Sequence, residues 1–99
     1  MARIVLQATD AEADDWTVVQ WEGVNGQWHD VTGWQGNFLQ DNSVVWWVAS
    51  GQLGQENFRW LVYDDETRTR LLITSETFDL PSQSNETVTV QSRLLTYQN

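Results

Sequence analysis

Two short, strongly apolar runs, at residues 44–48 and 58–63, constrain what this chain can fold into. Both consist mainly of β-branched and aromatic residues, Val-Val-Trp-Trp-Val and Phe-Arg-Trp-Leu-Val-Tyr. Such side chains lose rotamer freedom in a helix and fit the pleated, half-buried surface of a sheet. Because turn-forming residues such as Ser50, Gly51 and Asp64 bound the runs, we predict two β-strands around which the rest of the domain packs.

Strand alternation assigns the side chains of each run to opposite faces. In the second run the face that carries Arg59 is the better candidate for the outside, which also turns Leu61 and Tyr63 outward. In the first run we expect Trp47 to face outward and to need cover. The residues predicted to face the core are Trp46, Val48, Phe58, Trp60 and Val62.

The rest of the chain has the pattern of short strands separated by polar turns. Residues 2–8 alternate and are predicted as an edge strand. Asn25 and Gly26 are the strongest short hairpin signal, joining a strand at residues 16–21 to one at 27–31. The remaining expected elements are a bulge or turn at Gly33, a loop at 36–42, and a connection at 51–57 with Leu53 reaching the core. A returning strand is expected at 70–75 and continues at 78–80 past a kink, and a final strand is expected at 86–95 with Val88, Val90 and Leu94 inward.

The number and spacing of these segments predict the fold class. No helical stretch with caps is present, and about eight short strands with polar turns indicate an all-β sandwich or barrel. A barrel that opens around a ligand usually needs a longer chain. We therefore predict an antiparallel β-sandwich of about seven to eight strands, forming one domain over residues 1–99.

The charge of the chain limits its partners. The net charge is -9, with no lysine and five arginines. A field of that sign repels phosphate backbones and anionic membrane surfaces, so nucleic acid is not an expected partner. There is no apolar run near the length of a membrane span, and residues 1–10 do not read as a signal peptide, so membrane insertion is not expected either.

Seven tryptophans are more than a domain of this size needs. Each indole buries about 150–250 Å², so two or three would anchor a small core. Some of the seven are therefore expected on the surface, and these exposed tryptophans are the main indication of a binding site in the sequence. The candidate interface or ligand residues are Trp28, Trp34, Trp47, Leu61 and Tyr63.

Two functions use these candidates. In the first, Trp47, Leu61 and Tyr63 form an apolar patch of a structural or protein-interaction module, whose partner is another domain or an identical chain. In the second, Trp28, Trp34 and Trp47 stack against sugar rings in a carbohydrate-binding module. The polar neighbours expected around that sugar are Gln27, Asp30 and Gln35.

Catalytic and metal chemistry find little support in the sequence. The chain has one histidine and no cysteine, and His29 and Asp30 point to opposite faces of a strand, so they cannot form a catalytic pair. The acidic stretch at 9–15 lacks the ordered spacing of a calcium loop, and a solvated loop is the preferred interpretation, with a calcium site as the alternative. We predict a non-catalytic domain with no cofactor and no metal.

One segment also carries a family pattern: W-x-V, a loop ending on leucine and glycine, an aromatic that opens an alternating strand, and S-x-x-F-x-L. The matching residues are Trp46, Val48, Leu53, Gly54, Phe58, Trp60, Val62, Ser75, Phe78 and Leu80. In this third of the chain, residues 46–80, the sequence resembles the Ig-like β-sandwich module of cell-wall and cell-surface proteins, as in the Ser/Thr-rich, membrane-anchored yeast cell-wall family. It departs from that pattern in its extra final strand and in its tryptophan-rich first half. The resemblance implies an Ig-like, non-catalytic, extracellular module with no carried-over active site.

Overall fold

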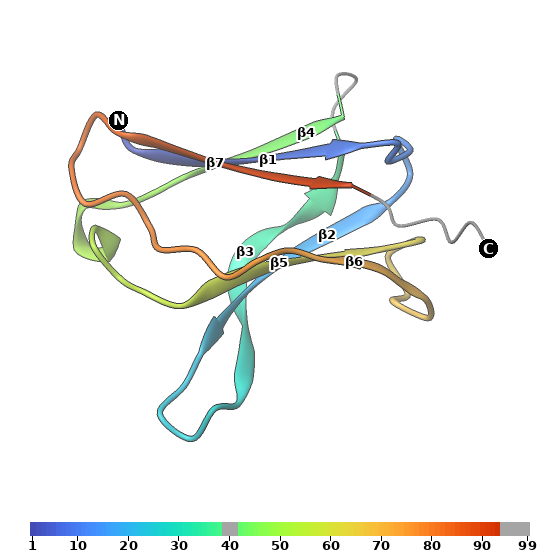
Figure 1. The fold of residues 1–99 in the computed structure, drawn as a ribbon, viewed down its shortest axis with the longest axis horizontal. Helices are drawn as coiled ribbons and strands as arrows, with labels where there is room; N and C mark the ends of the chain where they lie inside the picture. The colour runs from blue at the N-terminus through green and yellow to red at the C-terminus, as the bar shows by residue number, and fades with distance from the viewer. Residues whose placement is uncertain (39–41, 94–99) are drawn as a thin grey trace.

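Seven strands form two facing sheets in the computed structural model, which describes residues 1–38 and 42–93 (Figure 1). The predicted all-β sandwich is confirmed, and the two apolar runs become β4 and β5, one in each sheet. A short 3₁₀ turn, η1 (Ser50–Gln52), lies in the connection between them. The strands are β1 (Arg3–Thr9), β2 (Trp16–Glu22), β3 (Trp28–Asn37), β4 (Ser43–Trp47), β5 (Phe58–Tyr63), β6 (Leu71–Thr74) and β7 (Thr87–Arg93).

The first sheet has the order β4-β1-β7, so β1 lies in its centre. The prediction of an edge strand at residues 2–8 is wrong, because β1 pairs with β7 along its whole length, from Arg3 opposite Thr87 to Thr9 opposite Arg93. This pair is parallel, whereas β1 and β4 are antiparallel. A partner so distant in the chain leaves no trace in the local pattern of β1.

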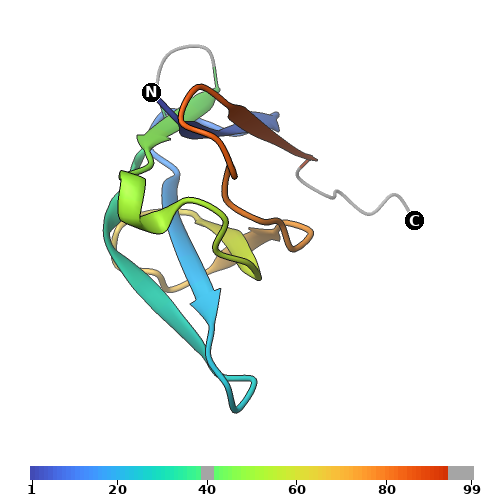
Figure 2. The same cartoon turned by 90° about the vertical axis from the view of Figure 1, so that its left-hand side faces the viewer.

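The second sheet is antiparallel throughout and has the order β3-β2-β5-β6. The predicted hairpin between β2 and β3 is confirmed, although its turn starts earlier: Gly26 N–H donates to the Gly23 carbonyl at 3.0 Å, and only Gly26, with a φ of 78°, takes a positive φ there. The end of this hairpin projects beyond β5, on the side of the domain away from the first sheet (Figures 1 and 2). β3 extends to Asn37, so the loop expected from residue 36 begins later.

The core lies between the two sheets and uses the predicted faces of β4 and β5. Phe58, Trp60 and Val62 are buried, and the Trp60 ring stacks on that of Phe78 at a centroid distance of 5.8 Å. Leu53 packs against the core from the β4–β5 connection, as expected. Val90 is buried and Val88 half-buried on β7, whereas Leu94 lies outside the described residues. The core residues of the first sheet are Ala2, Ile4, Leu6, Ala8, Val44 and Val48.

A bulge in β3 separates tryptophans that an unbroken strand would place on one face. Asp30 lies opposite Gln20 and Gln35 opposite Val18, so five residues along β3 span two along β2. The three extra residues, with Gly33 at a φ of 89°, reverse which face the side chains occupy. Trp28 therefore points away from the core, whereas Trp34 points into it and is only 8% exposed. The prediction that Trp34 offers its ring to a ligand is wrong.

Leu61 is also buried, although it points to the outer face of its sheet as predicted. It is 4% exposed and lies opposite Val18, which is fully buried. β5 is flanked by β2 and β6, so Leu61 has a neighbour on each side, Val18 and Thr74. Leu61 is therefore not available for an exposed apolar patch.

Candidate functional site

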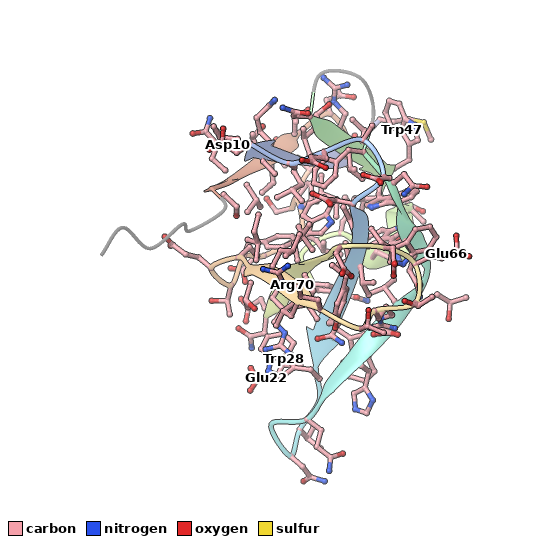
Figure 3. All side chains as sticks on the ribbon, turned by 90° about the vertical axis from the view of Figure 1, so that its right-hand side faces the viewer. Asp10, Glu22, Trp28, Trp47, Glu66 and Arg70 are labelled. Carbon is pink, nitrogen blue, oxygen red and sulfur yellow. The ribbon has the colours of Figure 1, made fainter. Side chains whose placement is uncertain are left out.

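The candidate residues do not form one surface. Trp47 is 55% exposed on the outer face of the first sheet, with the Arg3 guanidinium carbon 5.9 Å from its ring centroid. Trp28 and Tyr63 are half-buried on the outer face of the second sheet. Figure 3 shows Trp47 beside the first sheet near the top of the view, and Trp28 well below it beside the second sheet.

Trp28 and Tyr63 belong to a chain of contacts on the same sheet face as the buried residues Leu61 and Val18, which we call the outer-face network. The Arg59 guanidinium carbon lies 4.2 Å from the Trp28 ring centroid, and Arg59 Nε donates to Gln20 Oε1 at 2.9 Å. Gln20 Nε2 in turn donates to Asp30 Oδ1 at 2.9 Å. The network ends at Arg68, which bonds Asp30 and lies 5.0 Å from the Tyr63 ring centroid.

The polar side chains of this network form hydrogen bonds with one another rather than with a ligand. Arg68 donates to both carboxylate oxygens of Asp30, and this hydrogen bonding holds the pKa of Asp30 below its ordinary value despite partial burial. Asp30 was expected to serve a sugar, but its carboxylate has three internal donors. The ring of Trp28 is likewise occupied by Arg59. We therefore assign this face a structural role.

A pocket of about 600 Å³ opens on the other side of the β2–β3 hairpin. Its residues come from the projecting ends of β2 and β3, from the β4–β5 connection and from the start of β5. Phe58 forms the buried part, whereas Trp21 is 42% exposed. The lining residues are Trp21, Asp30, Val31, Thr32, Gln52, Gln55, Glu56 and Phe58.

Trp21 is positioned by its partner across the hairpin. It pairs with His29, and the two ring centroids are 4.6 Å apart with planes inclined by 31°. His29 is exposed, as predicted, and faces away from the Asp30 carboxylate. A Cβ on Gly23 would lie only 3.1 Å from His29 Nε2, so the glycine leaves room for the imidazole. One side of the indole is thereby supported while much of the ring stays open to solvent.

The opposite wall of the pocket is fixed by hydrogen bonds to the segment after β6. Gly54 N–H donates to the Pro81 carbonyl, and Leu80 N–H donates to the Gln55 carbonyl, both at 2.9 Å. Asn57 N–H donates to Asp79 Oδ1 at 3.2 Å. These bonds fix the backbone while the Gln55 and Glu56 side chains remain exposed.

The groups that line the pocket are suited to binding a small polar molecule that has an apolar face. It presents an open aromatic face, amides, a hydroxyl and one uncommitted carboxylate, Glu56, and no arginine occurs among its described lining residues. A group of three His, Cys, Asp or Glu side chains able to hold a metal is absent from residues 1–38 and 42–93. In the acidic stretch Asp15 is 7% exposed and accepts the Glu12 N–H at 2.9 Å, so it forms part of a turn.

Comparison of the chain with known protein families, curated proteins and solved structures finds no match. The resemblance to cell-surface modules therefore stays a prediction. Within the described part of the chain, no helix has the length and apolar character needed to cross a membrane.

The sequence interpretation missed Trp21 as a site residue. Alternation places Trp21 on the same face as buried Val19, which indicates a core residue. One feature of the sequence could have indicated that Trp21 is exposed. Trp21 lies close to the predicted hairpin turn, and the end of a hairpin often extends past the facing sheet. Whether the first sheet reaches far enough to cover Trp21 depends on the tertiary structure.

Proposed function

We propose that this protein is a non-catalytic carbohydrate-binding domain with Trp21 as its stacking surface. The observation that carries the proposal is the open indole of Trp21 on the wall of a pocket with amide and hydroxyl groups. The apolar face of a sugar ring packs on an indole, and its hydroxyls exchange hydrogen bonds with amides, carboxylates and water. Carbohydrate binding was also the second function predicted from the sequence, but that prediction placed the sugar on Trp28, Trp34 and Trp47 rather than on Trp21.

Size and charge support a neutral sugar. The pocket volume lies within the range of about 300–1,000 Å³ usual for small-ligand sites. The net charge of -9 and the exposed Glu56 disfavour an anionic sugar. The resemblance to cell-surface modules supports an extracellular setting for such binding.

Trp47 supports protein interaction as a second candidate function. Its ring is 55% exposed and far from the Trp21 pocket, with Arg3 beside it. Exposed tryptophan and arginine are enriched where proteins bind one another. The partner would be another domain or an identical chain.

Tryptophan fluorescence with matched variants tests the proposed carbohydrate binding. The protein is titrated with soluble β-glucan, xylan, galactomannan and chitin oligosaccharides. We expect at least one glycan to shift or quench the emission of the wild type and of Trp47→Ala, but not that of Trp21→Ala. No response to any glycan, or a response that Trp21→Ala retains, would contradict the proposal.

Sedimentation over a concentration series tests the second candidate. If Trp47 lies in a self-interface, the wild type associates and Trp47→Ala does not. A wild type that stays monomeric at all concentrations rules out the identical chain as the partner.

A further inference from the structure

The four edge strands of the two sheets differ in how well they resist pairing with another chain. β3 is interrupted by its bulge and carries Asp30, while β4 and β6 are only five and four residues long. β7 has seven residues, no proline, and no charged side chain from Thr87 to Ser92. Bulges, charges and short length are the usual protections of an edge, so β7 is the least protected of the four.

The hydrogen-bond pattern shows which backbone groups of β7 are directed outward. Arg3 N–H donates to the Glu86 carbonyl at 3.1 Å, and Arg3 lies opposite Thr87. In a parallel ladder, alternate residues direct both their N–H and C=O to the same neighbour. Glu86, Val88 and Val90 therefore bond toward β1, whereas Thr87, Thr89 and Gln91 direct their backbone groups to the free edge. No other strand of the described chain pairs there.

A groove of about 250 Å³ lies beside this edge, between β7 and the segment after β6. Its lining is mixed: Phe78, Val88 and Val90 are apolar, and the polar lining residues are Glu76, Thr77, Thr89 and Gln91. A strand added to β7 would direct alternate side chains inward next to this groove. Backbone bonds and side-chain pockets together are the features of peptide binding by strand addition.

We propose that the free edge of β7 binds an extended peptide of a partner protein, which adds a fourth strand to the first sheet. The peptide carries apolar, β-branched residues at alternate positions, which enter the groove, and a basic residue near an end. Charge is the reason for this choice of partner. Glu86 precedes the uncharged stretch 87–92 of β7, and Glu76 borders the groove, whereas the one charged residue of β7 is Arg93 at its end. With a net charge of -9 on the chain, the two glutamates attract a basic peptide, and two copies of this chain repel each other.

Fluorescence anisotropy with a synthetic peptide tests the proposal. The probe is a fluorescein-labelled peptide of alternating threonine and valine with an arginine at each end. A control peptide has the same composition except for a central proline. We expect saturable binding of the first peptide and none of the second, because proline removes a backbone donor.

The decisive variant is Thr89→Pro, which removes an N–H directed to the free edge and leaves the bonds to β1. We expect the dissociation constant of the probe peptide to rise about tenfold or more. The matched control is Ser84→Pro, in the turn where Glu86 N–H donates to the Gln83 carbonyl at 3.1 Å. Proline suits this second turn position, so the affinity should remain within about twofold of the wild type.

If circular dichroism shows that Thr89→Pro does not fold, Thr89→Arg takes its place, since an added cation at the edge repels the basic peptide. Absence of binding to the wild type, or equal affinity for the wild type and the edge variant, overturns the proposal. Self-association that Thr89→Pro or Thr89→Arg abolishes would also overturn it, by assigning the edge to a second copy. Glycan titrations of the same variants remain unchanged, because the Trp21 pocket is a separate site.

Discussion

Arg68 Nη1 lies 2.8 Å from Asp30 Oδ2, and this contact ties the β5–β6 loop to β3 across the two strands between them. The ion pair is the last member of the outer-face network, which shares a sheet face with Leu61 and Val18. Both side chains are about one-third exposed, 30% and 35%, so water screens their attraction. Its main consequence is geometric, because it joins side chains of two separate elements on this face.

Asp30→Asn should lower the free energy of unfolding at pH 7 by about 0.5–1 kcal/mol. Arg68 depresses the folded-state pKa of Asp30 below its unfolded value near 4. The stabilisation is therefore present above about pH 4 and is lost as the pH falls through the folded-state pKa. Urea unfolding of wild type and variant at several pH values measures the difference. Arg70→Gln removes an exposed arginine of the same loop and should show no such pH-dependent difference.

Leu61→Ala should lower the free energy of unfolding by about 2–4 kcal/mol. The reason is that Leu61 is only 4% exposed. Leu71→Ala, at a position 51% exposed on the neighbouring strand, should cost less than about 0.5 kcal/mol. Denaturant unfolding compares the two substitutions, and similar losses would contradict the burial of Leu61.

Acrylamide should quench the emission of Trp21 and Trp47 more readily than that of the other indoles. These rings are 42% and 55% exposed, whereas Trp34 and Trp60 are buried. Trp21→Phe and Trp47→Phe should each reduce the readily quenched fraction, and the double variant should have little left. Stern–Volmer plots give these fractions. Strong quenching that persists in the double variant would place another tryptophan at the surface.

Gly33→Ala should cost about 1–2 kcal/mol of stability. Gly33 has a φ of 89°, a conformation that side chains with a Cβ rarely adopt, and no atom within 4 Å would meet the new methyl group. The cost is therefore one of backbone strain in the bulge. Gly51→Ala also meets nothing within 4 Å and lacks the positive φ, so thermal unfolding should show a change within about 0.5 kcal/mol.

Asp15→Asn should raise stability at pH 7 by about 0.5–1 kcal/mol. Burial, aided by the nearby charges of Asp14 and Asp64, raises the pKa of Asp15 in the folded state. The ionised form therefore costs stability at neutral pH, and this cost disappears as the pH falls through the raised pKa. The asparagine keeps an acceptor for the Glu12 N–H. Urea unfolding should show a gain that shrinks in acid, and a loss at pH 7 would contradict the assignment.

Local sequence was sufficient to locate most of the strands and to assign the faces of β4 and β5. Period-two alternation of β-branched and aromatic residues placed Trp60 and Val62 inward and Trp47 outward, and Asn25 with Gly26 marked the hairpin. These features depend on the geometry of a few consecutive residues. Applied to an unbroken strand, the same local rule would place Trp28 and Trp34 on one face, because it does not register the three extra residues that the bulge inserts.

Tertiary structure alone decided which strands are neighbours and what covers them. Arg3 bonds Thr87 across almost the whole chain, and this pairing makes β1 central and β7 an edge. Backbone N–H and C=O groups are alike in every strand, so alternation does not specify their partners. Leu61 is buried because β5 is a central strand, and β7 has a free edge because it is the last strand of its sheet, so both depend on long-range pairing. Trp21 is open because it lies where the hairpin extends past the rest of the domain, which also depends on tertiary structure.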